Sequence, residues 1–418
     1  MRTQQYNTII LTAFFALLSF MPAHAETFEA YVQRLSQHPQ VESILAGSEA
    51  LRSQAQGELG LPDPMFMIGI DNMPISDPAF DRFLPTSKVI GFSQAIPNPA
   101  AREAKSERYE QMSEKQKLIA DYTNARLRFM LISKLAEYES VKTQKKLIKT
   151  QLSHYKELEN TFKGQIESGR SVYQRFSEVD VERAEAERKL NGLDARQASI
   201  EAEFLRLIDE VPDIKLPEIS DLTWDQNPAS LYPVVIAGED IDIAQKDVDI
   251  ADAAFLPNFG INAVYKQRED GENGMFAGDD WFSVQAQVSI PLWASSNQKP
   301  KLKAAKEREK SAQLAYNDSS RLWVKQMTAL QSNRDAAARN VKVLQDKDWA
   351  MKKKIAAAER NYESGTENLD SVLLAKIDRL NIQAQLAAVK EAYVSRAAEF
   401  NSNIIGSDKN TTLKEVSE

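Results

Sequence analysis

Two long stretches of the sequence, residues 100–211 and 301–418, contain no proline. Both are rich in Ala, Glu, Lys, Arg, Gln and Leu, the residues that lose least conformational entropy in a helix. A continuous helix over residues 100–163 would be on the order of 96 Å long, which is more than one globular core can bury. The chain is therefore expected to build an elongated structure from long helices.

Three short motifs recur along the chain at separations of 194 to 196 residues, which predicts an internal tandem repeat. The pairs are Leu-Pro-Asp at 61–63 with Leu-Pro-Asn at 256–258, Ile-Pro at 96–97 with 290–291, and Glu-Ser-Gly at 167–169 with 363–365. We expect a first repeat over residues 26–220 and a second over residues 221–418. Each is expected to contain a helix, two strands and further long helices, the latter at about 100–210 and 301–405.

Proline and glycine gather between the helical stretches, and four strands are expected there. They lie at about 65–70, 89–96, 258–266 and 281–292. The fourth strand is the clearest, because its apolar side chains alternate strictly with serine and glutamine. Its apolar positions, which we expect to face lipid, are Phe282, Val284, Ala286, Val288 and Ile290.

Four amphipathic strands cannot form a stable membrane structure by themselves. An open sheet in hydrocarbon leaves the N–H and C=O groups of its edge strands without hydrogen bonds. The smallest membrane barrels use about eight strands, so four cannot close. If these strands enter a membrane, several copies of the chain must complete one barrel. The same ring of copies would gather the long helices into a tube.

The helical stretches carry apolar residues at alternating spacings of three and four, as in coiled coils. In the first repeat this stripe consists of Leu118, Tyr122, Ala125, Phe129, Ile132 and Ala136. In the second repeat it consists of Val341, Leu344, Met351, Ile355, Ala358 and Tyr362, and Asp348 is its one polar interruption. Long antiparallel coiled-coil helices are therefore expected.

The composition excludes several classes of function. Residues 1–25 have the pattern of a cleaved signal peptide, with Arg2 before an apolar run and a cleavage site at Ala23-His24-Ala25. A formal charge of −8 without an extended basic tract argues against nucleic-acid binding. Because the chain has no cysteine, thiolate metal sites and lipidation through Cys are excluded. No catalytic motif is present, so we expect no enzyme activity, no cofactor and no metal site.

The order of these elements and several motifs resemble the TolC-like outer membrane efflux proteins. The motifs are Leu-Pro-Asp-Pro-Met at 61–65, Phe-Ser-Gln-Ala-Ile-Pro-Asn-Pro at 92–99 and Asn-Tyr-Glu-Ser-Gly-Thr at 361–366. The resemblance covers essentially the whole chain after the signal peptide. It implies a mixed α+β membrane protein, in which a homotrimer forms one twelve-stranded transmembrane β-barrel and a periplasmic tunnel of helices, the α-barrel.

The resemblance also implies a location and partners. The protein would lie in the outer membrane of a Gram-negative bacterium, with a large periplasmic part. It would act as the passive exit duct of a tripartite efflux pump, together with a periplasmic adaptor protein and an inner-membrane transporter of the resistance-nodulation-division type.

Two stretches, Leu-Pro-Asp-Pro at 61–64 and Asp-Asn-Met-Pro at 71–74, most resemble the branch of this family that serves heavy-metal pumps. They favour metal cations as the cargo. Drug efflux and type I protein secretion remain alternatives. An alternative of another class is a soluble periplasmic coiled-coil adaptor or scaffold.

The resemblance places an adaptor contact or a gate where each long helix reverses at a glycine. The candidate residues there are Gly169, Arg170, Gly365, Thr366, Asp370, Ser371 and Leu374. In the family's best-known tunnel, acidic residues line the closed periplasmic end. The corresponding positions here are Ser371 and Leu374, and Glu367 and Asp370 lie one helical turn earlier. An acidic ring is either displaced or absent, and in the second case Leu374 would close the tunnel by packing.

Two groups of side chains near the strands allow more than one interpretation. Met65, Met67 and Met73 allow a path for a soft metal, because thioethers favour Cu(I), and Met65 and Met67 share one face of the first strand. An apolar surface that faces lipid or packs in the belt is the favoured interpretation. Trp281, Phe282 and Trp293 bracket the fourth strand, either as anchors at the membrane interface or as ordinary packing residues.

Overall fold

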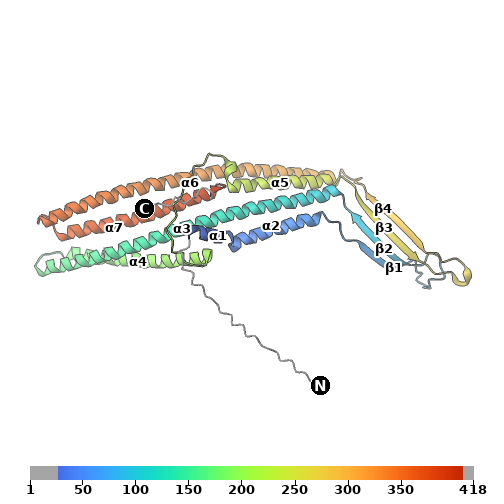
Figure 1. The fold of residues 1–418 in the computed structure, drawn as a ribbon, viewed down its shortest axis with the longest axis horizontal. Helices are drawn as coiled ribbons and strands as arrows, with labels where there is room; N and C mark the ends of the chain where they lie inside the picture. Colours follow the sequence, from blue (N-terminus) through green and yellow to red (C-terminus); the bar gives the residue numbers. More distant parts are fainter. Residues whose placement is uncertain (1–26, 408–418) are drawn as a thin grey trace, which may run out of the picture.

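The computed structural model describes residues 27–407, and the expected signal peptide lies outside this range. Helices and a four-stranded sheet follow one another along a strongly elongated molecule (Figure 1). In chain order the elements are α1 (Phe28–Ser36), α2 (Pro39–Glu58), β1 (Met65–Asp71), β2 (Ser87–Ile96), α3 (Pro99–Glu167), α4 (Tyr173–Ile208), η1 (Pro228–Ser230), α5 (Tyr232–Ala253), β3 (Asn258–Gln267), η2 (Glu272–Gly274), β4 (Trp281–Ser289), α6 (Gln298–Glu363) and α7 (Leu369–Ser402). The expected combination of long helices and four strands is confirmed.

The sheet is antiparallel throughout, in the order β1-β2-β3-β4. The strands lie close to the expected ranges, with one clear difference at the end of β4. This strand ends at Ser289 rather than near residue 292, so Ile290 lies just outside it. Pro291 explains the difference, because proline has no backbone N–H to donate and restricts the residue before it.

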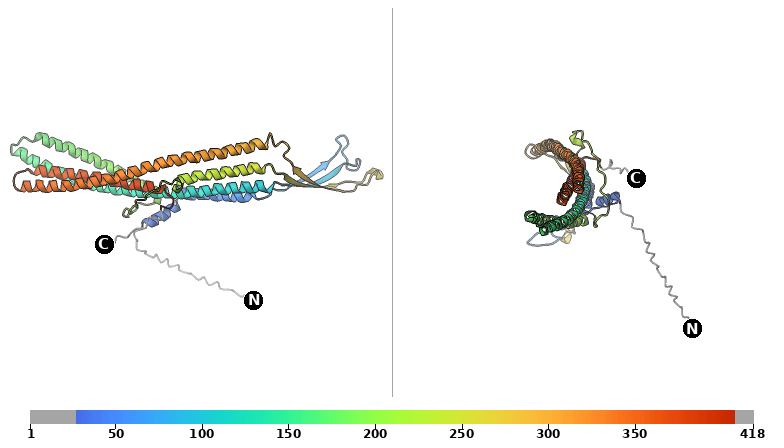
Figure 2. Two further views of the ribbon diagram at one scale, coloured as in Figure 1. Left: turned by 90° about the horizontal axis from the view of Figure 1, so that it is seen from above. Right: turned by 90° about the vertical axis from the view of Figure 1, so that its left-hand side faces the viewer.

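The helices form a single curved layer in two tiers (Figures 1 and 2). The two long helices, α3 with 69 residues and α6 with 66, run through both tiers. Next to the sheet the lateral order is α2-α3-α5-α6, and towards the far end it is α4-α3-α7-α6. The layer therefore has two side edges, one formed by β1, α2 and α4 and the other by β4 and α6. Seen from the far end, the helices lie along an open arc (Figure 2, right).

Asn98 joins the sheet to the helical layer. Its side-chain oxygen accepts a hydrogen bond from the N–H of Ala101 at 2.6 Å and caps α3, and Pro99 occupies the first turn. Its side-chain nitrogen donates to the carbonyl of Ala253 at the end of α5, 3.2 Å away. The first helix after β2 is thus fixed to the helix that precedes β3.

The largest hydrophobic core lies at mid-length, where α1, α3 and α4 meet the linker between the two halves of the chain. Leu35, Leu131 and Phe204 are completely buried in it. Ile132 and Ala136 of the expected α3 stripe are buried too, but Leu131 from a neighbouring face is buried more deeply. Because α3 has helices on both sides, it needs two seams rather than one.

We expect the substitution Leu131→Ala to destabilise the protein by about 2–5 kcal/mol, because it leaves a cavity in a fully packed core. The loss of helical circular dichroism on heating should then begin at a lower temperature than in the wild type. Lys149→Ala, an exposed position on the same helix, is the matched control and should leave the transition in place. Equal transitions for both variants would contradict this assignment of the core.

Candidate functional site

One face of the sheet is apolar across all four strands. Phe66, Phe92, Ala263 and Val284 face one another across the sheet, because the strand registers pair each with the next. Further members of this face are Ile68, Ile70, Ile90, Ile96, Phe259, Ile261, Tyr265, Phe282, Ala286 and Val288. Lys88, Gln94 and Gln267 are its polar exceptions. We call these side chains the apolar face.

The opposite face, which we call the polar face, is made mostly of small and polar side chains. Its members on β3 and β4 are Asn258, Gly260, Asn262, Val264, Lys266, Trp281, Ser283, Gln285, Gln287 and Ser289. On β2, the residues Ser87 and Val89 of this face are buried by their neighbours, whereas Ile90 of the apolar face is 56% exposed. This difference is expected when the polar face is the inner, concave side of a curved sheet.

A single chain leaves this sheet incomplete in two ways. Its apolar face is uncovered, with Ile68 85%, Phe66 74% and Phe282 70% exposed. Its outer strands β1 and β4 each have one edge without a neighbouring strand among the described residues. Uncovered apolar area of this kind marks a surface for lipid or another protein, and unpaired edges favour addition of further strands.

The expected lipid-facing residues Phe282, Val284, Ala286 and Val288 lie together on the apolar face. Ile290 is exposed as well, but it follows the strand. Met65 and Met67 lie on the polar face, opposite Ser93 and Gly91, and so on the other side of the sheet from the expected lipid-facing residues. Strand β1 is apolar on both faces, so its own sequence could not distinguish them.

The aromatic residues near β4 lie in different surroundings. Trp281 is on the polar face, with the guanidinium carbon of Arg268 4.1 Å from its ring centre. Phe282 is on the apolar face, and Trp293 is 74% exposed in the turn between β4 and α6. Trp281 and Phe282 therefore lie on opposite faces of the sheet, and Trp293 lies outside it.

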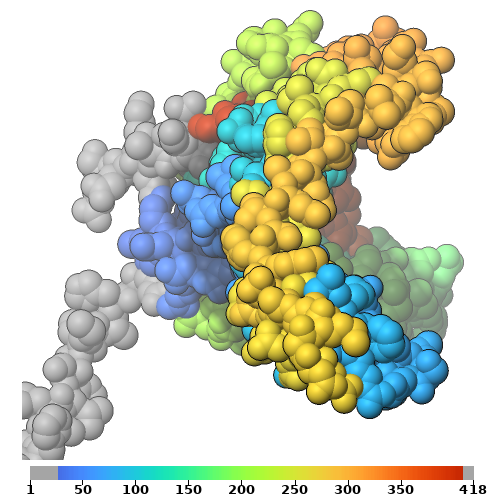
Figure 3. Space-filling model, turned by 90° about the vertical axis from the view of Figure 1, so that its right-hand side faces the viewer, coloured from blue at the N-terminus to red at the C-terminus, as the bar shows by residue number. Residues whose placement is uncertain are grey.

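Two loops at the far end of the sheet, residues 72–86 and 268–280, are fastened together (Figure 3). Arg268 is buried and donates hydrogen bonds to the carbonyls of Leu84 (3.1 Å) and Asp279 (2.9 Å). The N–H of Glu272 donates to the carbonyl of Asp81 at 2.9 Å. The two loops come from different halves of the chain, and these hydrogen bonds hold them together. We call the two loops together the rim.

At the opposite end of the molecule, the two helical turns have the same geometry. Gly169 and Gly365 adopt φ values of 85° and 77°, which favour glycine. The N–H groups of the following residues, Arg170 and Thr366, donate to carbonyls five residues back, each at 2.9 Å. These are the hydrogen bonds of a glycine-terminated helix, and they make each turn tight.

Asp370 is buried beside these turns rather than exposed at their surface. Its carboxylate forms an ion pair of 2.7 Å with Arg175 of α4, and its Oδ1 has no hydrogen-bond partner among the described residues. The Arg175 guanidinium also lies over the ring of Phe162 on α3. One buried carboxylate therefore connects α7 with α4 and α3. Ser371 is partly buried and Leu374 is 39% exposed. Neither side chain is acidic, so these two positions cannot contribute carboxylates to an acidic ring.

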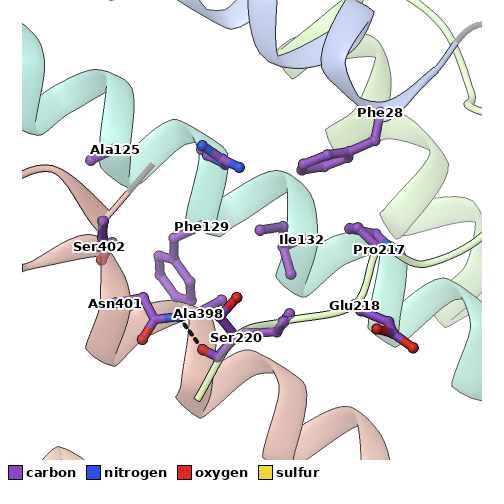
Figure 4. Close-up of a pocket in the computed structure, with 13 residues that line it drawn as sticks. Phe28, Ala125, Phe129, Ile132, Pro217, Glu218, Ser220, Ala398, Asn401 and Ser402 are labelled. Atoms are coloured by element: carbon purple, nitrogen blue, oxygen red, sulfur yellow. Dashed lines mark hydrogen bonds between the residues drawn. The ribbon is translucent and has the colours of Figure 1, made fainter. Parts of the chain in front are cut away.

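Two of the cavities in the middle of the molecule differ in character. A small one of about 40 Å³ lies between α1, α3, α7 and the linker, where Asn401 donates a hydrogen bond to the carbonyl of Ser220 at 2.8 Å (Figure 4). At this volume it is a gap between packed side chains that could hold a molecule about the size of water. A groove of about 740 Å³ lies between α3 and α7. Burial raises the pKa of Glu391 in this groove, and burial with a hydrogen bond to Asp221 raises that of Tyr393 to about 12.

Neither a metal-ligand cluster of His, Cys, Asp and Glu nor a helical membrane span is found within residues 27–407. No group of three or more His, Cys, Asp or Glu side chains there is arranged to hold a metal ion. No helix in the same range is both long and apolar enough to cross a membrane.

Comparison with known proteins agrees with this geometry. Residues 237–402 match the model of the outer membrane efflux protein family. The resemblance to outer membrane efflux proteins is confirmed. No curated protein sequence matches the chain.

Several solved structures of similar proteins share the fold of the whole chain. CusC, solved in a study of folding and transmembrane channel formation, is 12% identical, with a TM-score of 0.73 and coverage of 90% of this chain and 91% of CusC. The open MtrE outer membrane channel of Neisseria gonorrhoeae is 14% identical, with a TM-score of 0.73 and coverage of 90% and 88%. VceC of Vibrio cholerae is 14% identical, with a TM-score of 0.66 and coverage of 89% and 96%.

Adjacent residues of β4 test which face of the sheet meets lipid. Val284→Lys puts a charge on the apolar face and should cost about 2–4 kcal/mol per copy near the bilayer centre. If the apolar face meets lipid, this variant should be lost from the outer membrane fraction on immunoblots. Gln285→Lys, on the polar face, should be recovered there as the wild type is. Loss of the Gln285 variant alone would reverse the assignment of the two faces.

Proposed function

We propose that three copies of this chain form an outer membrane exit duct. Their sheets would close into one twelve-stranded barrel, with the apolar faces toward lipid and the polar faces toward a wet lumen. The helical layers would continue the barrel into the periplasm as a tunnel. The proposal rests above all on a sheet that has two free edges and an uncovered apolar face.

The side edges of the helical layer support such a ring. Helix α6, which forms one edge, has 16 Lys and Arg against 8 Asp and Glu. Helix α4, on the other edge, has 6 against 8. Apolar side chains are exposed on both edges, among them Val343 and Trp349 on α6 and Val181 on α4. In a closed ring, α6 of one copy would meet α2 and α4 of the next, with favourable charge and apolar contact.

The helical tip is proposed as the contact with a periplasmic adaptor protein and as the gate. The turns at Gly169 and Gly365 present Arg170 and Thr366 at the end of the tunnel, where an adaptor would approach. The ion pair between Asp370 and Arg175 would hold α7 against α4 and keep the tip closed. Energy for transport would come from an inner-membrane pump of the resistance-nodulation-division type.

Metal cations are the proposed cargo. The resemblance of residues 61–64 and 71–74 to the heavy-metal branch favours them, and so does the charge of the rim. The two rim loops, residues 72–86 and 268–280, carry seven Asp and Glu against two Arg. Three copies would give a strongly negative mouth, which attracts cations. A drug or protein duct needs no such field, and a soluble scaffold would not leave the apolar face uncovered.

A deletion strain tests the cargo. We expect it to become more sensitive to copper, silver or divalent cations, and plasmid-borne wild-type chain should restore tolerance. Candidate pump deletions should be compared for the same phenotype. Unchanged tolerance to every metal together with increased drug sensitivity would reject the metal assignment and favour drug efflux.

Asp370→Asn tests the gate. Loss of the carboxylate charge removes the ion pair with Arg175, so α7 should separate from α4 more readily. The single-channel conductance of the purified trimer in planar bilayers should rise several-fold. Asp378→Asn, an exposed position further along α7, is the matched control. Equal conductance for the wild type and both variants would remove Asp370 from gating.

A further inference from the structure

Two thioether side chains stand on the polar face of the sheet. Met65 and Met67 lie at alternate positions of β1 and therefore point to the same side. Both are strongly exposed, at 69% and 53%. Exposed methionine on a wall otherwise made mostly of small and polar residues is not explained by lipid contact, because lipid would meet the opposite face.

The neighbouring strand leaves room for these side chains. Gly91 on β2 pairs with Met67, and a Cβ atom at position 91 would lie only 3.1 Å from the terminal methyl carbon of Met67. Ser93, which pairs with Met65, is also small. Met67 therefore lies across β2 on the polar side, and both sulfur atoms belong to the wall of the proposed lumen.

The chemistry of this pair selects soft cations. Thioether sulfur prefers Cu(I) and similar ions over hard divalent cations. Alternate residues of a strand are about 7 Å apart along its axis, a separation that the flexible side chains of two methionines can bridge to reach one ion. The ligands are neutral, so they add no electrostatic attraction for Zn(II) or Mg(II).

We propose that Met65 and Met67 form a weak, exchangeable site for a soft monovalent cation, Cu(I) or Ag(I), on the lumen wall. The inference rests on the proposed function, because it requires the polar face to line a conduit. Three copies would supply three separate sites around the barrel. Two neutral ligands hold an ion loosely, which suits a conduit in which the cargo must also leave.

The test uses the purified wild-type trimer with ¹³C-methyl methionine, observed by NMR in detergent. Silver nitrate in a chloride-free buffer supplies Ag(I) without redox chemistry. The methyl signals of Met65 and Met67, assigned through the Leu variants of each, should shift together and saturate. Each single variant should weaken binding on the order of tenfold, because one of two ligands is lost. Leu has nearly the volume of Met, so folding should be preserved.

Met275 is the matched control, since it is 77% exposed in a loop and has no methionine two positions away. Its methyl signal should not saturate in the same range, and Zn(II) should move none of the three signals. Equal shifts at Met275, or no shift at Met65 and Met67, would overturn the site. The single-channel conductance of the same preparation separates failure of the methionine site from failure of the proposed duct. A conducting trimer without silver binding rejects the methionine site alone, whereas a preparation without channels rejects the proposed duct and the site with it.

Discussion

Backbone hydrogen bonding at the two sheet edges governs this structure. Within residues 27–407 of one chain, β1 and β4 each present a row of N–H and C=O groups with no strand beside them. In water these groups can be solvated, but in hydrocarbon each would cost several kcal/mol. The apolar face, with Phe66 and Ile68 largely exposed, demands contact with hydrocarbon or protein at the same time. The proposed closure with strands of further copies in a bilayer meets both demands.

The helical layer transmits this closure along the molecule. Each central strand is joined to the helices within a few residues, and the Asn98 cap ties the start of α3 to the end of α5. The curvature of the sheet and the arc of the helices are therefore coupled. Because α3 and α6 run through both tiers, a ring formed at the sheet also positions the helical tip about seventy residues away.

The fold could be predicted from sequence wherever a pattern was local. Strict alternation identified β4, and the absence of proline identified α3 and α6. Strand β1 was harder, because Met65 and Met67 are apolar like Phe66 between them, and only pairing with β2 separates the faces. The partner of Asp370 could not be predicted either. Arg175 is distant in the sequence, and helical packing alone brings them together.

The charges at the two ends of the molecule are arranged differently. This difference bears on how the largely uncharged polar face of the sheet could distinguish hard from soft cations. At the tip, the buried Asp370 is neutralised by Arg175, so the pair holds helices rather than attracting ions. At the rim, Arg268 is surrounded by carbonyl groups that use its donors for structure. The seven rim carboxylates still outnumber the two rim arginines, although Asp77 and Glu272 lie near Arg82 and Glu269 pairs with Lys88, so the excess negative field extends into solvent. On the polar face of β3 and β4, serine, asparagine and glutamine offer hydration without net charge. Discrimination between hard and soft cations along such a wall therefore requires ligands of a different chemical kind, and thioethers are the ones β1 supplies.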